Sequence, residues 1–172
     1  MALAGPAAER DDGAMVTPTL TDQLGRTWFA ADIPPGALER LAALGRIVDF
    51  EEGAVVITEG MPCPSLGVVV DGRIALRLSL PGGEDRTILT VEVGDVIGWS
   101  AVLPPAIATS TGIAVAPTRV IAFDGASLRA ALQSDCELGA AVYERLLVGV
   151  ARRLMATRTQ LLDLYRPGGE AW

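Results

Sequence analysis

The sequence contains no histidine and no lysine, so all 14 of its basic residues are arginine. These absences exclude the chemistry that needs an imidazole or a primary amine: histidine-containing catalytic triads, histidine metal sites and lysine Schiff bases. The carboxylate pairs Glu51–Glu52 and Glu84–Asp85 lie beside glycines in predicted turns. Such positions favour solvated charges over acid–base catalysis. We therefore do not expect an enzyme.

Cysteine is scarce as well, with Cys63 and Cys136 as the two examples. Two cysteines far apart in the sequence make neither a zinc site nor a disulfide framework. A reducing compartment favours two free thiols, with Cys136 near a helix start, although the sequence leaves open whether they meet. We expect no metal and no cofactor.

The chain also lacks an excess of positive charge, because its net charge is -7. That balance argues against a nucleic-acid partner, since phosphate neutralisation supplies most non-specific affinity for DNA. No uncharged apolar run reaches the length of about 18 residues that a membrane helix needs. The N-terminal stretch "MALAGPAAERDD" has neither the basic nor the apolar region of a secretion signal. We expect a cytoplasmic protein without a membrane partner.

Half of the 172 residues are apolar, which is enough for one domain with a single core. Residues 1–19 show no periodicity and are interpreted as a loose tail. The segment "PGALERLAALG" predicts a short amphipathic helix that starts at Pro34-Pro35 and stops at Gly45. Its apolar residues Leu38, Leu41 and Leu44 have helical spacing.

Residues 46–124 consist of eight short Val, Ile and Leu runs that are separated by glycine and proline. Turn signals about every 8–12 residues are typical of an antiparallel sandwich or barrel. The run "RIALRLSL" alternates in polarity, which predicts a half-buried strand. Ile74, Leu76, Leu78 and Leu80 would share one face, and Arg73, Ala75, Arg77 and Ser79 the other.

The last third of the sequence has helical periodicity. "DGASLRAALQS" predicts a short helix with Asp124 as its start signal. A helix of about 31 residues follows, longer than most globular helices. Leu138, Val142 and Leu146 form an apolar row that should pack on the β-domain. A second row, the dimer seam, is predicted to pair with a second copy of the chain: Tyr143, Leu147, Val150, Leu154, Thr157, Leu161 and Leu164.

This order of elements, with "FEEGAVVITEG", "GVVVDGRIAL" and "VGDVIG" in sequence, resembles the cyclic nucleotide-binding domain of the catabolite activator protein (Crp/Fnr) family. The resemblance spans about residues 34–165. It implies a mainly β fold with flanking helices, a double-stranded β-helix (jelly roll). We assign residues 20–134 to the N-terminal helices and the β-roll, and residues 135–166 to the long dimerisation helix.

The segment from Gly98 to Ser110, which corresponds to the family's phosphate-binding cassette, departs from the family pattern. By that resemblance, Trp99 stands where the family has a glutamate for the ribose, and Ala108 where it has an arginine for the cyclic phosphate. We therefore predict no binding of cyclic AMP or cyclic GMP at micromolar concentration. An apolar pocket with a few hydroxyls suits uncharged or amphipathic molecules. Its predicted ligand-binding residues are Gly98, Trp99, Ser100, Ala101, Thr109, Ser110 and Thr157.

Each of these residues has a simpler alternative. Trp99 fits core or dimer packing equally well, and Thr157 can bond a carbonyl of its own helix. Thr109 and Ser110 also fit as plain strand residues, and Arg152-Arg153 as a solvated helix face.

After Tyr165 the sequence has seven residues, "RPGGEAW", whereas the family's transcription factors continue into a helix-turn-helix domain. We expect residues 167–172 to be a tail and no DNA-binding domain to follow. The predicted function is a stand-alone, homodimeric regulatory module that senses a small molecule and acts through a protein partner. The alternative is a ligand-free interaction or structural module, with its pocket closed by Trp99 and Ile107.

Overall fold

The structure is a computed structural model, which describes residues 18–79 and 85–164, with side chains up to residue 159. Of the predicted N-terminal tail, the structure describes Pro18 and Thr19, and the predicted C-terminal tail (residues 167–172) lies outside the described residues. The side chains of Leu80, Leu161 and Leu164 also lie outside them.

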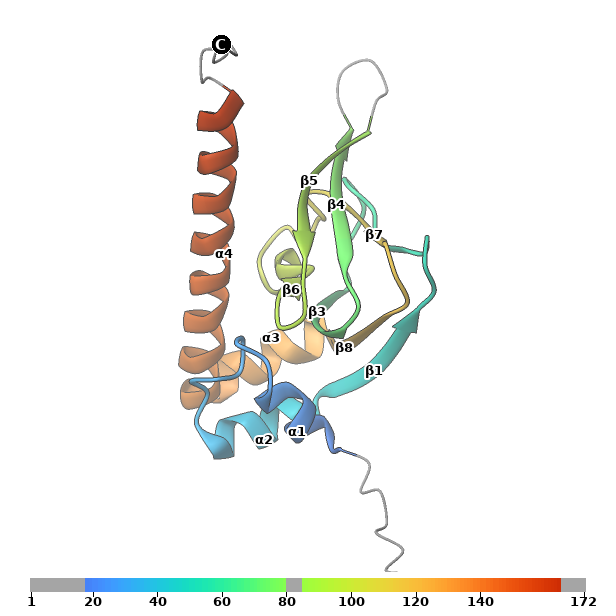
Figure 1. Cartoon of the computed structure of the whole chain (residues 1–172). Helices are drawn as coiled ribbons and strands as arrows, with labels where there is room; N and C mark the ends of the chain where they lie inside the picture. The colour runs from blue at the N-terminus through green and yellow to red at the C-terminus, as the bar shows by residue number, and fades with distance from the viewer. Residues whose placement is uncertain (1–17, 80–84, 165–172) are drawn as a thin grey trace, which may run out of the picture.

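Two four-stranded antiparallel sheets form the β-roll (Figure 1). The first has the order β1-β8-β3-β6, with the bounds Gly45–Phe50, Thr118–Asp124, Ser65–Asp71 and Val96–Ile97. The second has the order β2-β7-β4-β5, with the bounds Val55–Ile57, Thr111–Ala114, Ile74–Ser79 and Asp85–Val91. Among the described residues, these strands coincide with the eight predicted apolar runs, and the predicted mainly β class is confirmed.

The core between the sheets is aliphatic, because both inner faces carry β-branched side chains and leucines. Val69, Ile74 and Val91 are fully buried there. Ala75 was predicted on the solvent face of β4, but it is only 5% exposed, so this part of the prediction is wrong. β4 is an inner strand, and its cross-strand neighbours Thr90 and Ile113 shield the small side chain.

Two short helices precede the roll. α1 (Leu20–Gly25) has a capping box, in which the Thr19 hydroxyl accepts from the backbone N–H of Asp22 at 3.1 Å. α2 (Pro35–Ala43) has a proline at its first position, where no intrahelical N–H bond is lost. It buries Leu41, as its spacing predicts, and Gly45 then begins β1.

Two further helices follow the roll. α3 (Gly125–Ser134) is capped by Asp124, whose carboxylate accepts from the Ser127 N–H at 2.8 Å. α4 (Cys136–Leu164) is the predicted long helix, and its row Leu138, Val142 and Leu146 is buried against the core. In Figure 1, α1, α2 and α3 gather at one end of the roll, and α4 stands beside it. Within the described residues, no helix combines the length and apolarity needed to cross a membrane.

Candidate ligand-binding site

The segment after β6 forms a tight turn at the surface of the roll. Gly98 has φ 71°, in the left-handed region, and leads into the short 3-10 helix η1 (Trp99–Val102). A Cβ at Gly98 would clash with the carbonyl oxygen of Ser65 and lie 3.1 Å from the Cys63 sulfur. Only glycine meets both requirements without strain.

A cavity of about 250 Å³ lies between this turn, the β4–β5 strands and α4. Aliphatic side chains form most of its wall, including Leu76, Leu78 and Ile97. Six of the seven predicted ligand-binding residues line it: Gly98, Trp99, Ser100, Thr109, Ser110 and Thr157. The cavity therefore collects residues from two parts of the chain more than 45 positions apart, and their role in binding stays a prediction.

Ala101 does not line this cavity. It is fully buried in a small cluster with Cys63 and Ala108, because the 3-10 turn directs it inward, away from α4. The prediction that Ala101 belongs to this site is therefore corrected on geometric grounds. Ala108, which the sequence resemblance places at the family's arginine position, is 3% exposed in the same cluster.

Trp99 has the core packing that one of its alternatives predicts, and its role in ligand binding stays a prediction. It packs against the core and also separates two cavities, one lined by the hydroxyls and one almost wholly apolar. The apolar cavity, also about 250 Å³, has α4 residues Tyr143, Leu146, Leu147 and Val150 as one wall.

Thr157 shows the simpler of its two alternatives, and ligand contact stays a prediction. Its hydroxyl donates to the backbone carbonyl of Arg153 at 3.0 Å, as expected for a threonine inside a helix, and it lines the cavity as well.

Arg153 is the residue that the sequence interpretation missed. The predicted solvated face holds for Arg152, which is exposed, but Arg153 is half-buried and lines the cavity. Its guanidinium donates to the backbone carbonyl of Val96 in β6. Burial lowers the pKa of Arg153, and the nearby carboxylate of Asp95 opposes that shift. A positive charge thus enters the cavity from α4 and not from the cassette.

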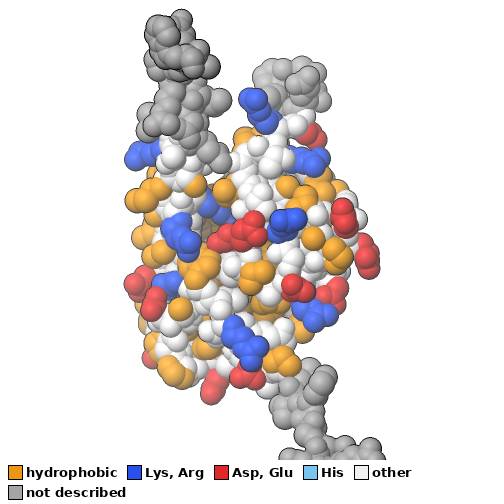
Figure 2. All heavy atoms as spheres, viewed as in Figure 1, with side chains coloured by type: hydrophobic (Ala, Val, Ile, Leu, Met, Phe, Trp, Pro, Cys, Tyr) orange, Lys and Arg blue, Asp and Glu red, His pale blue; other side chains and the backbone are white. Residues whose placement is uncertain are grey.

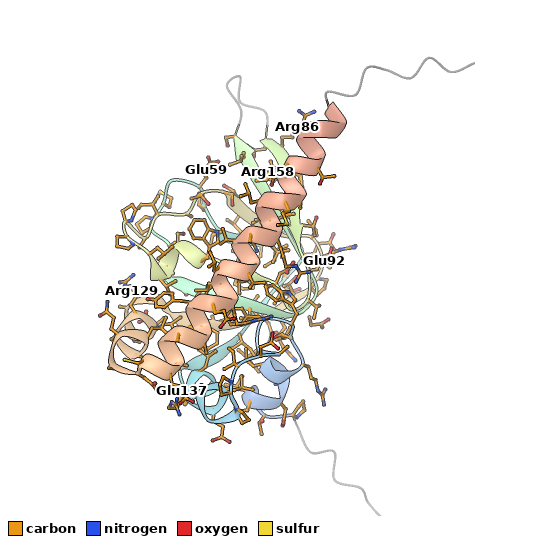
Figure 3. The ribbon with its side chains drawn as sticks, turned by 90° about the vertical axis from the view of Figure 1, so that its left-hand side faces the viewer. Glu59, Arg86, Glu92, Arg129, Glu137 and Arg158 are labelled. Carbon is orange, nitrogen blue, oxygen red and sulfur yellow. The ribbon has the colours of Figure 1, made fainter. Side chains whose placement is uncertain are left out.

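α4 is held against the roll by a cluster around Trp28. The Trp28 indole donates to the Asp95 carboxylate at 2.8 Å, and the guanidinium of Arg152 lies 4.6 Å from the ring centroid. Arg145 lies over the same ring at 5.3 Å and also donates to the carbonyl of Phe29. These contacts join α4 to the Trp28–Phe29 segment and to Asp95, directly before β6. Figure 3 shows α4 crossing the roll from Glu137 to Arg158.

Other functional groups are few. Both cysteines are free, Cys63 buried and Cys136 exposed at the start of α4. In the part of the chain that the structure describes, no three or more acidic or cysteine side chains gather as a metal site would require.

A family profile, "Cyclic nucleotide-binding domain", matches residues 47–135, which is more than half of the chain. The chain belongs to the cyclic nucleotide-binding domain family. The resemblance noted from the sequence is thereby confirmed.

Relatives with known descriptions agree. The chain is 27% identical over 141 residues to the CRP-like cAMP-activated global transcriptional regulator of Mycobacterium tuberculosis, covering 82% of this chain and 61% of that regulator. A putative cyclic nucleotide-binding protein from Geobacter metallireducens is 26% identical with a TM-score of 0.69, covering 81% of this chain and 99% of that one. The N-terminal domain of a Streptomyces coelicolor transcriptional regulator is also 26% identical, with a TM-score of 0.63, and the match covers 86% of this chain and all of that one.

Within this cyclic nucleotide-binding domain, the cavity is lined by the hydroxyl residues Ser100, Thr109, Ser110 and Thr157. That Trp99 and Ala108 stand at the two family positions that would carry charge stays a prediction from the sequence. Arg153 is the cation that the described cavity wall retains.

Proposed function

We propose that this cyclic nucleotide-binding domain is a homodimeric regulatory module, not an enzyme, that binds a small molecule other than cyclic AMP or cyclic GMP. It would act through a protein partner. The observation that carries the proposal is the open cavity of about 250 Å³ between the cassette and α4, whose described lining holds Trp99 and no acidic side chain. Ala108, at the predicted arginine position, lies outside that lining.

Loss of the two charged contacts should strongly weaken the binding of a cyclic nucleotide. Removing one partner of a buried, hydrogen-bonded charge pair costs about 2–5 kcal/mol, which corresponds to roughly 30- to 3,000-fold in affinity. Backbone N–H groups at the start of a short helix contribute about 0.3–1 kcal/mol toward an anion and do not replace a guanidinium.

The cavity favours a ligand-binding role over the ligand-free alternative. A closed pocket requires Trp99 and Ile107 to fill the space between the cassette and Thr157. Trp99 instead forms one wall, and Ile107 lies away from the cavity in a bridge with Pro62. An interior packed at core density would leave no such space.

Exposure of the dimer seam supports a homodimer. Leu147 is 70% exposed and Leu154 54%, while Tyr143 and Val150 are also exposed along α4. Figure 2 shows hydrophobic side chains along the outer edge of α4. Pairing with a second copy would remove this apolar row from water and cover the apolar cavity beside Trp99.

A thermal-shift screen against nucleotides, acyl compounds and metabolites tests the ligand. A compound that binds only the folded state raises Tm with concentration. Thr109→Trp should fill the cavity and abolish the shift, whereas Thr58→Trp, the same change at an exposed residue outside the cavity, should keep it. A uniformly flat screen contradicts ligand binding and favours the interaction module.

A further inference from the structure

The cavity has one charged side chain among the described residues that line it, and that side chain is Arg153. No aspartate or glutamate contributes to this wall. The charged group on this wall is therefore a guanidinium, with the Asp95 carboxylate nearby but outside the lining, and the hydroxyls on the wall are neutral.

The hydrogen bonding of Arg153 is incomplete. A guanidinium has five N–H donors, and in the described part of the chain the side chain makes one hydrogen bond, to the carbonyl oxygen of Val96. None of the ion pairs between described residues includes it. Burial lowers its pKa, but an arginine keeps its proton at neutral pH. A half-buried guanidinium with free donors and no ion-pair partner among the described residues is stabilised by a carboxylate small enough to reach it and accept two hydrogen bonds.

The rest of the wall accommodates an apolar body. Leu76, Leu78, Ile88 and Leu89 come from the β4–β5 strands, and Ile97 from β6. The volume of about 250 Å³ lies just below the roughly 300–1,000 Å³ of sites for drug-sized ligands, so the occupant is small.

We infer that the cavity binds a small organic anion, with one acidic group held by Arg153 and an apolar body packed among the aliphatic side chains of β4, β5 and β6. The inference rests on the proposed function, which requires a ligand in this cavity, and it adds the chemical class. The hydroxyls of Ser100 and Ser110, both largely buried, would complete the polar end.

The position of the cation has a consequence for signalling. Arg153 belongs to α4, whereas Ser100 and Ser110 belong to the roll, so an anion held by Arg153 contacts both elements. A ligand that bridges two elements prefers the arrangement in which both are in reach and shifts the population toward it.

Titration calorimetry with matched probes tests this inference on the whole chain. Hexanoate, octanoate and phenylacetate are each compared with the corresponding neutral amide. At least one acid should bind saturably and about tenfold or more tighter than its amide. Arg153→Gln should remove this preference. Arg158→Gln, the same exchange at an exposed arginine of the same helix (Figure 3), should retain it.

The outcomes separate the inference from the proposed function. Equal binding of acid and amide in the unmodified chain contradicts the anion, without relying on any variant. If that binding is lost in Thr109→Trp but not in Arg153→Gln, the cavity is a ligand site and the inferred class is wrong. No binding of any acid also overturns the inference, whereas low-micromolar binding of cyclic AMP overturns the proposed function.

Discussion

Gly98 determines the shape of the cassette because its backbone lies in the left-handed region, with φ 71°. A side chain there meets the backbone of Ser65, which cannot move without disturbing β3. Gly53 also has a positive φ, of 86°, but no atom lies within 4 Å of its missing Cβ. The two glycines therefore separate backbone strain from steric clash.

We predict that Gly98→Ala lowers the free energy of unfolding by about 3 kcal/mol, the sum of left-handed strain and overpacking. Gly53→Ala should lower it by only about 1 kcal/mol, from strain alone. Urea denaturation of both variants measures the difference. Equal losses would show that the contact with Ser65 does not constrain the cassette.

The sequence predicts the placement of some site residues better than that of others. The placement of Ser100 and Ser110 on the cavity wall could be predicted by alignment to the family motif, because Ser100 lies just after β6 and Ser110 directly before β7. The placement of Ala101 could not be predicted in this way, because successive side chains of a 3-10 turn point in different directions. Arg153 had a signal that was available: it lies three residues after Val150 and four before Thr157, which places it on their side of a helix.

At the level of elements, the docking of α4 depends on contacts that the sequence does not reveal. Trp28 lies more than 100 positions before α4, yet it contacts Arg145, Arg152 and the region of Gly149. A Cβ at Gly149 would lie 3.2 Å from the Trp28 ring, so the close approach of helix and ring favours a residue without a side chain.

We predict that Trp28→Ala lowers the free energy of unfolding by about 2–3 kcal/mol, through loss of aromatic packing and of two cation–π contacts. Amide hydrogen exchange in α4 should accelerate, because the helix loses its attachment to the N-terminal segment. Trp28→Phe keeps an aromatic ring but loses the hydrogen bond to Asp95. Its free energy of unfolding should therefore lie between those of Trp28→Ala and the unmodified chain. Unchanged exchange in α4 would contradict this role of Trp28.

The elements themselves were well predicted and their mutual orientation was not. Turn residues separate the strands, and the helix start signals of α2 and α3 are local, so both can be identified in the sequence. The rotation of α4 about its axis depends on Trp28 and on Val96, which come from distant segments. For that reason the sequence predicts a solvated face for both Arg152 and Arg153, although Arg153 lines the cavity.

At the scale of the whole molecule, the apolar row on α4 predicts association. Leu147→Glu places a charge at the most exposed seam residue among the described side chains and should convert a dimer to a monomer. Analytical ultracentrifugation at micromolar concentration measures the change. Met155→Glu provides the control, because Met155 is 66% exposed on the same helix but outside the seam.

A monomeric unmodified chain, or equal effects of the two substitutions, would contradict a dimer through this row. The two charges are equivalent in kind and in solvent exposure, so only their position relative to the seam differs. Retention of the folded state in both variants is checked by the same thermal transition.

The account as a whole depends on the proposal that Trp99 and Ala108 stand where the family has its charged contacts. Calorimetric titration of the chain with cyclic AMP, and then with cyclic GMP, tests this directly. We predict no saturable heat at micromolar nucleotide. A low-micromolar Kd for either nucleotide would contradict the account, because it would show that the domain still recognises the cyclic phosphate without those two groups.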